Sequence, residues 1–239
     1  MEVAAVKILT RAVDMDKKEQ YTLALILYQE GIQVLLNTIK EVTDAKKKDH
    51  LRVKANSYLD HAEKLKVLIE EKKALGQYRE QTKIEAGAIG YDYDSLFGRF
   101  LDENVVWIHV EDPYIRAYHQ CLNLVRLCEL SVQKCSSLSK IILTTTQDPD
   151  DSRNQNLRLQ ELKQSLKQSN ITMEVKFSDT LHDRQITLSN GWVIKIGRGL
   201  DYFKAPEGKF SLGACDMALR ATLETTVDIF HRNEIKKLI

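Results

Sequence analysis

The apolar side chains of the first 75 residues recur every three or four positions, in three successive stretches. This spacing places the apolar residues of each stretch on one helix face, so it predicts three helices. Short polar segments at residues 16–18 and 43–44 separate them; the second helix begins near Glu19 and the third covers residues 45–73. Short connections favour an antiparallel three-helix bundle, which we assign to residues 1–78. The predicted core residues are Val3, Val6, Leu9 and Val13; Leu25, Tyr28, Ile32, Leu35 and Ile39; and Leu51, Ala55, Tyr58, Ala62, Leu65 and Ile69.

The segment from residue 76 to residue 90 has no strong hydrophobic period and holds three glycines. Glycine-containing chain without periodicity is typical of a loop. We therefore predict a linker over residues 79–90, which divides the chain into two domains, with a loose extension of the preceding helix as the alternative.

Beyond residue 90 the pattern becomes an alternation of strand-like and helix-like stretches. Asn190-Gly191 between two apolar runs is the strongest short signal for a β-hairpin. Alternating strands and helices followed by a hairpin predict an α/β (α+β) domain with a mixed sheet over residues 91–239. The predicted strands cover residues 105–110, 140–145, 171–177, 185–189, 192–196 and 222–230, and the predicted helices cover 94–101, 112–135 (with Asp112-Pro113 at its start) and 157–166.

The charges of the 239-residue chain nearly cancel, because it contains 35 Lys and Arg and 34 Asp and Glu, which give a formal net charge of +1. We therefore expect no nucleic-acid partner, and any anionic partner must be met by a local patch. No apolar run approaches the roughly 20 residues of a membrane span, and the first residues carry no signal-peptide pattern. We expect a cytoplasmic protein.

Four cysteines occur without metal-binding or redox spacing. Cys121, Cys128 and Cys135 are seven residues apart on a predicted helix, so they share one stripe, where small buried side chains belong. We expect them to pack in the core, with metal or redox chemistry as the alternative. No phosphate-binding glycine loop and no nucleophile elbow occur, so we expect no metal and no other cofactor.

Leu59 lies beside the apolar stripe of the third predicted helix rather than on it. At 100° per residue, its neighbours on that side include Asn56, Glu63 and Lys66. An apolar residue in such surroundings suits the edge of a groove for an amphipathic helix, with Glu63 pairing an incoming Arg or Lys. The alternative is a single exposed leucine without a role, which is common on protein surfaces.

Two segments of the first domain resemble the microtubule-interacting-and-trafficking (MIT) family: YTLALILYQEGIQVLLNTI at 21–39 and YLDHAEKLK at 58–66. In that family the groove between helices 2 and 3 binds C-terminal amphipathic helices of ESCRT-III subunits, the charged multivesicular body proteins. The resemblance implies that Leu59, Asp60 and Glu63 face the ligand. We expect micromolar affinity, because a short helical peptide buries little area and loses conformational entropy on binding.

The second domain carries the string His182-x-Arg184-x4-Ser189, followed by the hairpin and Gly197. It is similar to the phospholipase D superfamily motif H-x-K-x4-D followed by G-S/G-x-N, in which the His is the nucleophile and the Lys holds phosphate. The resemblance implies that His182 is kept, that Arg184 can still hold phosphate and that Ser189 replaces the acid.

A second H-x-K/R string followed by such a hairpin does not occur in the sequence, so we expect no enzyme activity. Three alternatives stay open for the degenerate motif. It forms a retained anion pocket, or it is a remnant of the fold without a ligand, or two subunits combine their copies into one catalytic site.

Basic residues gather on and after the predicted hairpin. Tyr202 and Phe203 place an aromatic pair beside these charges, a combination that suits an anionic membrane interface. The alternative is a solvated strand edge that charges protect from other strands. The predicted lipid- or anion-binding residues are His182, Arg184, Lys195, Arg198 and Lys204.

The pairing of the two domains resembles a family in which an MIT domain precedes a degenerate phospholipase D-like domain. The resemblance implies a non-enzymatic homodimer, paired through its second domain, that links ESCRT-III subunits to acidic phospholipid membrane. It also implies recruitment to the midbody and the late endosome, with a role in abscission during cytokinesis. The rival function is a homodimeric phospholipase D-like phosphodiesterase with His182 as nucleophile.

Overall fold

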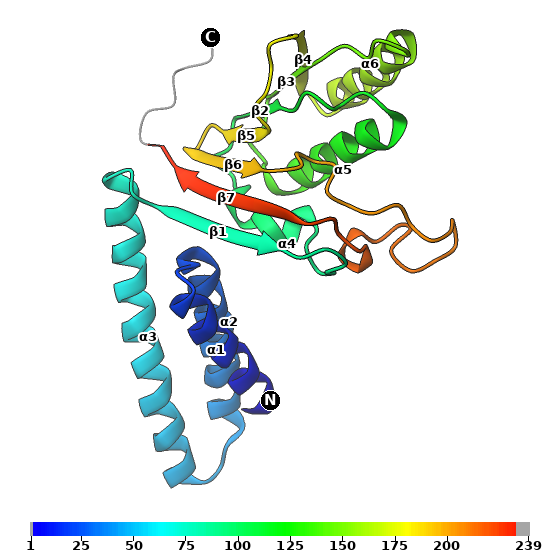
Figure 1. Cartoon of the computed structure of the whole chain (residues 1–239). Helices are drawn as coiled ribbons and strands as arrows, with labels where there is room; N and C mark the ends of the chain where they lie inside the picture. Colours follow the sequence, from blue (N-terminus) through cyan, green and yellow to red (C-terminus); the bar gives the residue numbers. More distant parts are fainter. Residues whose placement is uncertain (1, 233–239) are drawn as a thin grey trace. The chain divides into compact units, whose positions relative to one another are not determined.

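The computed structural model describes residues 2–232, which divide between two compact units, Met1–Glu80 and Gln81–Ile239 (Figure 1). The first unit contains three helices, α1 (Glu2–Lys17), α2 (Tyr21–Glu41) and α3 (Ala45–Ala74). They confirm the predicted all-α domain. The Asp44 side chain accepts a hydrogen bond from the Lys46 N–H (3.0 Å) and so caps the start of α3.

The buried side of α1 differs from the predicted stripe. Val3 and Val6 are exposed, whereas Leu9 and Ala12 are buried. A Cβ added at Gly31 of α2 would lie 2.6 Å from Cγ and Cδ2 of Leu9, so α1 and α2 approach closely at this point. The small residues Gly31 and Ala12 leave room for Leu9 in this contact, and Val3 and Val6 lie on the other side of α1.

The predicted linker over residues 79–90 is wrong in its first half, because residues Arg79–Ile84 form strand β1. β1 occupies one edge of the sheet, next to β7. Its sequence, REQTKI, is mostly polar because an edge strand is not buried on both sides, so it lacks the apolar alternation of a strand.

The second unit is built on a mixed seven-stranded sheet in the order β1-β7-β6-β5-β2-β3-β4. β2, β3 and β4 are parallel, while β5, β6 and β7 pair antiparallel. This confirms the predicted α/β (α+β) class with a mixed sheet. The remaining strands are β2 (Trp107–Glu111), β3 (Lys140–Thr145), β4 (Thr172–Phe177), β5 (Gln185–Leu188), β6 (Trp192–Ile196) and β7 (Thr225–His231).

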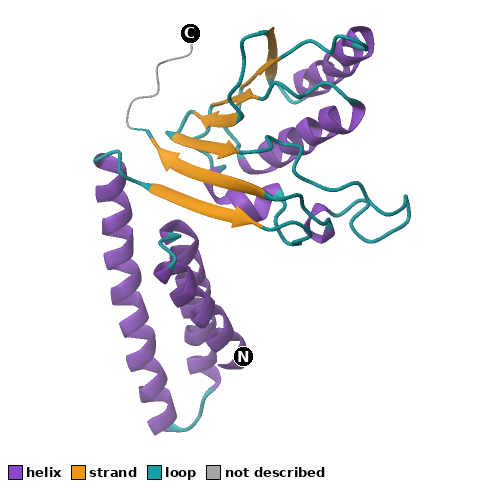
Figure 2. Ribbon diagram, viewed as in Figure 1, coloured by secondary structure: helices purple, strands orange, loops and turns teal. Residues whose placement is uncertain are grey.

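Helices α5 (Tyr118–Lys134) and α6 (Ser152–Gln168) connect the parallel strands as two β–α–β units, and they contact each other beside that part of the sheet (Figure 2). A short helix, α4 (Tyr93–Phe97), precedes β2. The hairpin around Asn190-Gly191 forms as predicted, with Gly191 at φ +103°, a conformation that favours glycine. Among residues 2–232, no helix has the length and apolarity to cross a membrane.

The helix predicted to begin at Asp112-Pro113 begins instead at Tyr118. Asp112 is buried, and its carboxylate accepts hydrogen bonds from the N–H groups of Tyr114 (2.9 Å) and Leu200 (3.0 Å). The Asp therefore closes a turn and joins two loops instead of capping the helix. An Asp-Pro pair starts turns as well as helices, so the sequence signal was ambiguous.

Candidate functional site

The first candidate site is a groove between α2 and α3, which holds a cavity of about 280 Å³. Leu59, Glu63 and Lys66 line it, as the helical wheel indicated. Asn56 and Asp60 do not line it: Asp60 lies 100° round α3 from Leu59, and Asn56 lies a turn earlier. The other lining residues are Leu25, Gln29, Ile32, Gln33, Leu36 and Ala62.

The α2/α3 groove has an apolar floor and a polar margin. Ile32 and Ala62 are buried beneath it, whereas Leu36 and Leu59 are 38% and 39% exposed. Two half-exposed leucines on facing helices can contact the apolar side of a third helix, while the margin offers a charge in Glu63. Sequence reasoning missed Leu36, although its position four residues after Ile32 places both on one helix face.

A second groove lies between α1 and α3 and holds a cavity of about 470 Å³. His61 Nε2 lies 2.6 Å from Asp16 Oδ2, and the Tyr28 hydroxyl donates to the same oxygen at 3.4 Å. Burial, followed by the negative charge of Asp16, raises the pKa of Tyr28 to about 12. These contacts join α1 to α2 and α3 beside the groove. The sequence analysis made no prediction for this second groove.

In the second unit, a pocket of about 230 Å³ lies at the carboxyl ends of β2 and β3, beside the start of β5. Open α/β sheets bind ligands at such strand ends. His182 and Arg184 both line the pocket, so the structure brings the two ends of the H-x-R string together. The other lining residues are Pro113, Tyr114, Arg116, Thr146, Asp179 and Leu181.

Two arginines give this pocket its positive character. The Arg184 guanidinium donates to the carbonyl of Gly197 (2.9 Å) and lies 4.3 Å from the ring centroid of Tyr114. Arg116 lies 5.5 Å from the same ring, and its Nε donates to Thr146 Oγ1 (2.6 Å). Fixed guanidinium groups can bind a phosphate through parallel hydrogen bonds. Asp179 also lines the pocket and partly offsets the charge.

Sequence reasoning missed Arg116, because it lies far along the chain from the H-x-R string. Its position after β2 is the available signal, since residues that follow parallel strands meet at one edge of the sheet.

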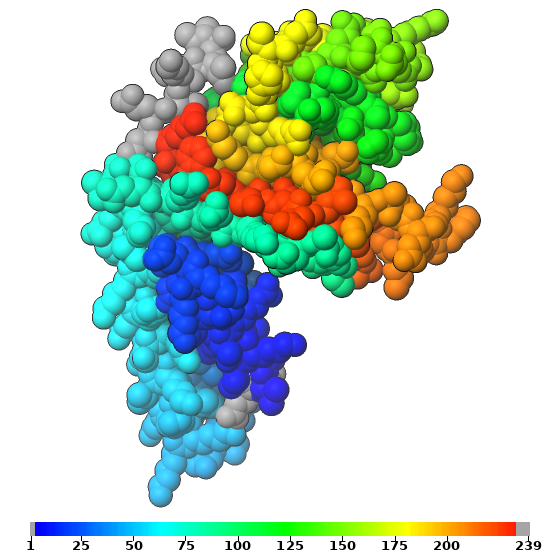
Figure 3. All heavy atoms as spheres, in the orientation of Figure 1, coloured from blue at the N-terminus to red at the C-terminus, as the bar shows by residue number. Residues whose placement is uncertain are grey.

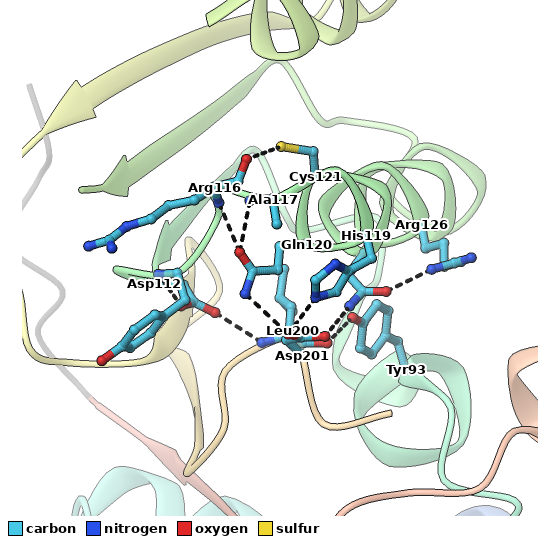
Figure 4. Close-up of polar contacts among 12 residues, drawn as sticks. Tyr93, Asp112, Arg116, Ala117, His119, Gln120, Cys121, Arg126, Leu200 and Asp201 are labelled. Carbon is cyan, nitrogen blue, oxygen red and sulfur yellow. Dashed lines mark hydrogen bonds and ion pairs between the residues drawn. The ribbon is translucent and has the colours of Figure 1, made fainter. Parts of the chain in front are cut away.

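A polar network at the start of α5 joins this helix and α4 to the segment after β6 (Figure 4). The Asp201 carboxylate accepts from the side-chain amides of Gln120 (3.2 Å) and Asn123 (3.1 Å). The Tyr93 hydroxyl donates to the carbonyl of Leu200 (2.6 Å). These bonds fix the segment that follows β6.

Three predicted anion-binding residues do not line the pocket. Lys195 pairs with Asp183 (Nζ to Oδ1, 3.7 Å), and Arg198 Nε donates to the Glu224 carbonyl (3.2 Å). Lys204 is exposed on the segment after Phe203.

The expected aromatic pair at the membrane interface is wrong. Tyr202 and Phe203 are 0% and 7% exposed, because their rings pack on Tyr93 at centroid distances of 5.9 and 5.6 Å. Aromatic rings that complete a core are not available to a bilayer.

Ser189, at the position of the motif's acid, lies at the opposite end of β5 from Arg184. Its hydroxyl oxygen accepts hydrogen bonds from the N–H groups of Val106 (2.7 Å) and Trp107 (3.3 Å). This position therefore attaches β5 to the start of β2, and Ser189 fills it without a carboxylate.

His182 is the one histidine among the residues that line the pocket. His109, on β2, bonds Thr144 Oγ1 (Nε2, 2.9 Å), and burial lowers its pKa. His119 lies against Asp201 (3.2 Å). In the described part of the chain, no cluster of three His, Cys, Asp or Glu residues is placed to hold a metal ion.

Comparison with known proteins gives the class of the chain. Residues 3–67 match the MIT (microtubule interacting and transport) domain, and residues 90–231 match the phospholipase D-like domain found at the C-terminus of MIT. The chain therefore belongs to the family that joins these two domains. It is similar to MIT domain-containing protein 1 of Mus musculus, with 45% identity over 236 residues, which cover 98% of this chain and 95% of the mouse protein.

Proposed function

We propose that the chain is a non-enzymatic adaptor, whose MIT domain binds C-terminal helices of ESCRT-III subunits and whose second domain binds acidic phospholipid. The observation that carries the proposal is the pocket in which Arg116 and Arg184 lie beside a single histidine, His182. Guanidinium groups held in place suit a lipid phosphate. The superfamily's phosphodiesterases use a second copy of the motif, which this pocket does not supply.

The α2/α3 groove supports the tail-binding part of the proposal. An amphipathic helix can place one apolar side chain against Leu36 and Leu59 and a cation against Glu63. The area buried is small, so we expect micromolar affinity.

The groove is tested by Leu59→Asp in the full chain, with Val53→Asp as the matched control on an exposed position of α3 outside the groove. The probe is the C-terminal helix of a charged multivesicular body protein. We expect Leu59→Asp to lose at least tenfold in affinity with an unchanged melting temperature, while the control binds normally. A large loss of stability in Leu59→Asp would show that Leu59 supports the core instead.

The pocket is tested by Arg116→Glu combined with Arg184→Glu, with Lys163→Glu combined with Lys167→Glu on α6 as the charge-matched control. Circular dichroism checks that each variant is folded. We expect the parent and the control to sediment with vesicles containing phosphatidylserine or phosphoinositide, and the pocket variant to stay in the supernatant. Equal binding by both variants would exclude the pocket as the lipid site.

Phosphodiesterase activity is the second candidate, favoured by the presence of His182 and Arg184 in one pocket. The same vesicle assay decides it through the released headgroup. Release that His182→Ala abolishes would identify an enzyme, with the second histidine coming from a partner subunit. Binding without release supports the adaptor.

We further propose that the chain forms a homodimer through its second domain and acts on the cytoplasmic side of membranes. Recruitment to the midbody and the late endosome, with a role in abscission, follows from ESCRT-III binding. Sedimentation equilibrium tests the dimer. Imaging of the tagged protein in dividing cells tests recruitment, which Leu59→Asp should abolish.

A further inference from the structure

Residues 204–221 form one loop of the second unit, and the two ends of this loop are paired. Phe203 and Thr222 pair in an isolated antiparallel bridge, and the Lys204 N–H donates to the Ala221 carbonyl (2.9 Å) at the base. Figure 3 shows this segment in orange, projecting from the surface around it. Long loops in a compact domain usually have a function.

The loop is held by hydrogen bonds among its own residues and by one from outside, in which the Gly90 N–H donates to the Ala218 carbonyl (2.7 Å). The Arg220 side chain is buried, and its guanidinium donates to the carbonyls of Gly213 and Ala214, the latter at 2.7 Å. Asp216 accepts a hydrogen bond from the Ala218 N–H (2.9 Å). The loop therefore presents its tip in a defined geometry rather than as a random chain.

The tip consists of two consecutive β-turns. In the first, the Ser211 N–H donates to the Gly208 carbonyl (3.3 Å), and the Ser211 hydroxyl donates to the same oxygen (2.8 Å). Lys209 and Phe210 occupy the two central positions of this turn. Central positions usually carry Gly, Pro, Asn, Asp or Ser, so a phenylalanine there is unusual.

The second turn places Leu212 in the same way. The Ala214 N–H donates to the Ser211 carbonyl (3.1 Å), with Leu212 and Gly213 at the centre and Gly213 at φ +79°. Phe210 is 101% exposed and Leu212 is 88% exposed. Two large apolar side chains are thus held at the corners of an ordered projection, where they contribute nothing to the core.

We propose that the loop over residues 204–221 is a membrane wedge. Phe210 and Leu212 insert among the acyl chains at the surface of an acidic bilayer, while Lys209 stays at the level of the headgroups. This inference rests on the lipid binding proposed above. It adds to the Arg116–Arg184 pocket a second, apolar contact with the membrane.

Area favours a bilayer over a protein partner, and the charge next to the tip is compatible with one. Lys209 directly precedes Phe210 and can meet a negatively charged membrane surface, while Glu207 and Asp216 lie further from the apolar pair along the chain. Two side chains on a narrow tip cover far less than the roughly 800 Å² per partner of a stable protein interface. A bilayer needs no complementary surface, so a small apolar tip is sufficient.

The first test uses the full chain with Phe210→Ser and Leu212→Ser combined. The control combines Leu157→Ser on α6 with Val132→Ser on α5, two other exposed apolar positions. We expect the tip variant to lose about tenfold or more in partitioning to phosphatidylserine vesicles, and the control to match the parent. The part of the parent's binding that resists high salt should vanish in the tip variant, because apolar burial is not screened.

The second test measures how deeply the side chain at position 210 enters the bilayer. Phe210→Trp should shift its emission to shorter wavelength on acidic vesicles and be quenched by lipids brominated on their acyl chains. A Leu157→Trp control should show neither effect.

The outcomes separate the two proposals. If the parent protein does not bind acidic vesicles, both the proposed lipid binding and the wedge are overturned. A parent that binds while the tip variant binds equally overturns the wedge alone and leaves the pocket standing. A third outcome combines both tests: the tip variant loses binding and changes its oligomeric state, while Phe210→Trp is not quenched by the brominated lipids. That outcome assigns the tip to a protein contact and overturns the wedge.

Discussion

At the scale of one residue, Ser189 occupies the position of the motif's acid and binds backbone N–H groups there. Its oxygen accepts from two N–H groups at the start of β2. We expect Ser189→Ala to lower the free energy of unfolding by about 1 kcal/mol, because both donors lose their partner. Ser189→Asp should keep most of the stability, since a carboxylate accepts both bonds. Urea denaturation measures the difference, and equal stability of Ser189→Ala and the parent would contradict it.

The cysteines differ sharply in their environments. Cys121, Cys128 and Cys135 are buried and Cys215 is exposed. Burial raises the pKa of Cys128 to about 12 and that of Cys135 to about 11, so at pH 8 only about one in a thousand of the Cys135 thiols, and fewer of Cys128, would be ionised. We expect Ellman's reagent to titrate one thiol in the native protein and all 4 in denaturant.

Cys215→Ser identifies the reactive thiol, because it should remove the native signal completely. A second fast-reacting thiol in the native parent would show that the α5 stripe opens to solvent.

At this scale the sequence predicted what is local. His182 and Arg184 line one pocket because their spacing lies within a single motif. Arg116 could not be found from spacing, since the fold alone brings the end of β2 beside the start of β5. Tyr202 was misassigned because neighbouring charges say nothing about which way a ring packs.

At the scale of elements, the contact of α1 and α2 depends on Gly31. A Cβ at this position would lie 2.6 Å from Leu9 side-chain atoms. We expect Gly31→Ala to destabilise the protein by about 1–2 kcal/mol, because overpacking outweighs the gain in helix propensity. Thermal unfolding measures this change.

The Leu9→Ala background is the matched control for Gly31. With the larger side chain removed, Gly31→Ala should become neutral or stabilising by up to about 1 kcal/mol. A destabilisation of the same size in both backgrounds would show that Leu9 is not the obstacle.

Elements with a strong pattern were predicted, and elements set by context were not. The long helices and the Asn190-Gly191 hairpin carry period and turn signals that act locally. β1 was missed because one of its two buried residues is the charged Glu80, so its sequence shows no apolar alternation. The start of α5 was misplaced because Asp112 finds its partner 88 residues away, at Leu200.

At the scale of the whole molecule, two weak sites on one chain should act together. We expect the parent to bind acidic vesicles that display tethered tail peptides about 10²–10⁴ times more tightly than it binds either ligand alone, if both can be reached at once. Leu59→Asp should reduce binding to the level of the lipid contact. An affinity no greater than that of the tighter single site would contradict the linkage.

The division into a helical and an α/β domain could be predicted because the hydrophobic period changes along the chain. The family followed from short strings in each half, and the match of residues 3–67 and 90–231 confirms it. The sequence suggested what the chain binds through the surroundings of Leu59, through the basic residues of the hairpin and through the family resemblance, and the experiments above decide it.

The two ends of β5 have different functions. Arg184, before the strand, lines a ligand-sized pocket, and Ser189, after it, bonds the backbone at the start of β2. Mutations that change the chemistry at one end therefore need not disturb folding at the other. Here the attachment persists with Ser189 in place of the acid, while His182 and Arg184 stay together at the pocket. A sequence search that scores the whole string therefore adds up two independent properties, strand attachment and pocket chemistry, and the positions of each are better scored separately.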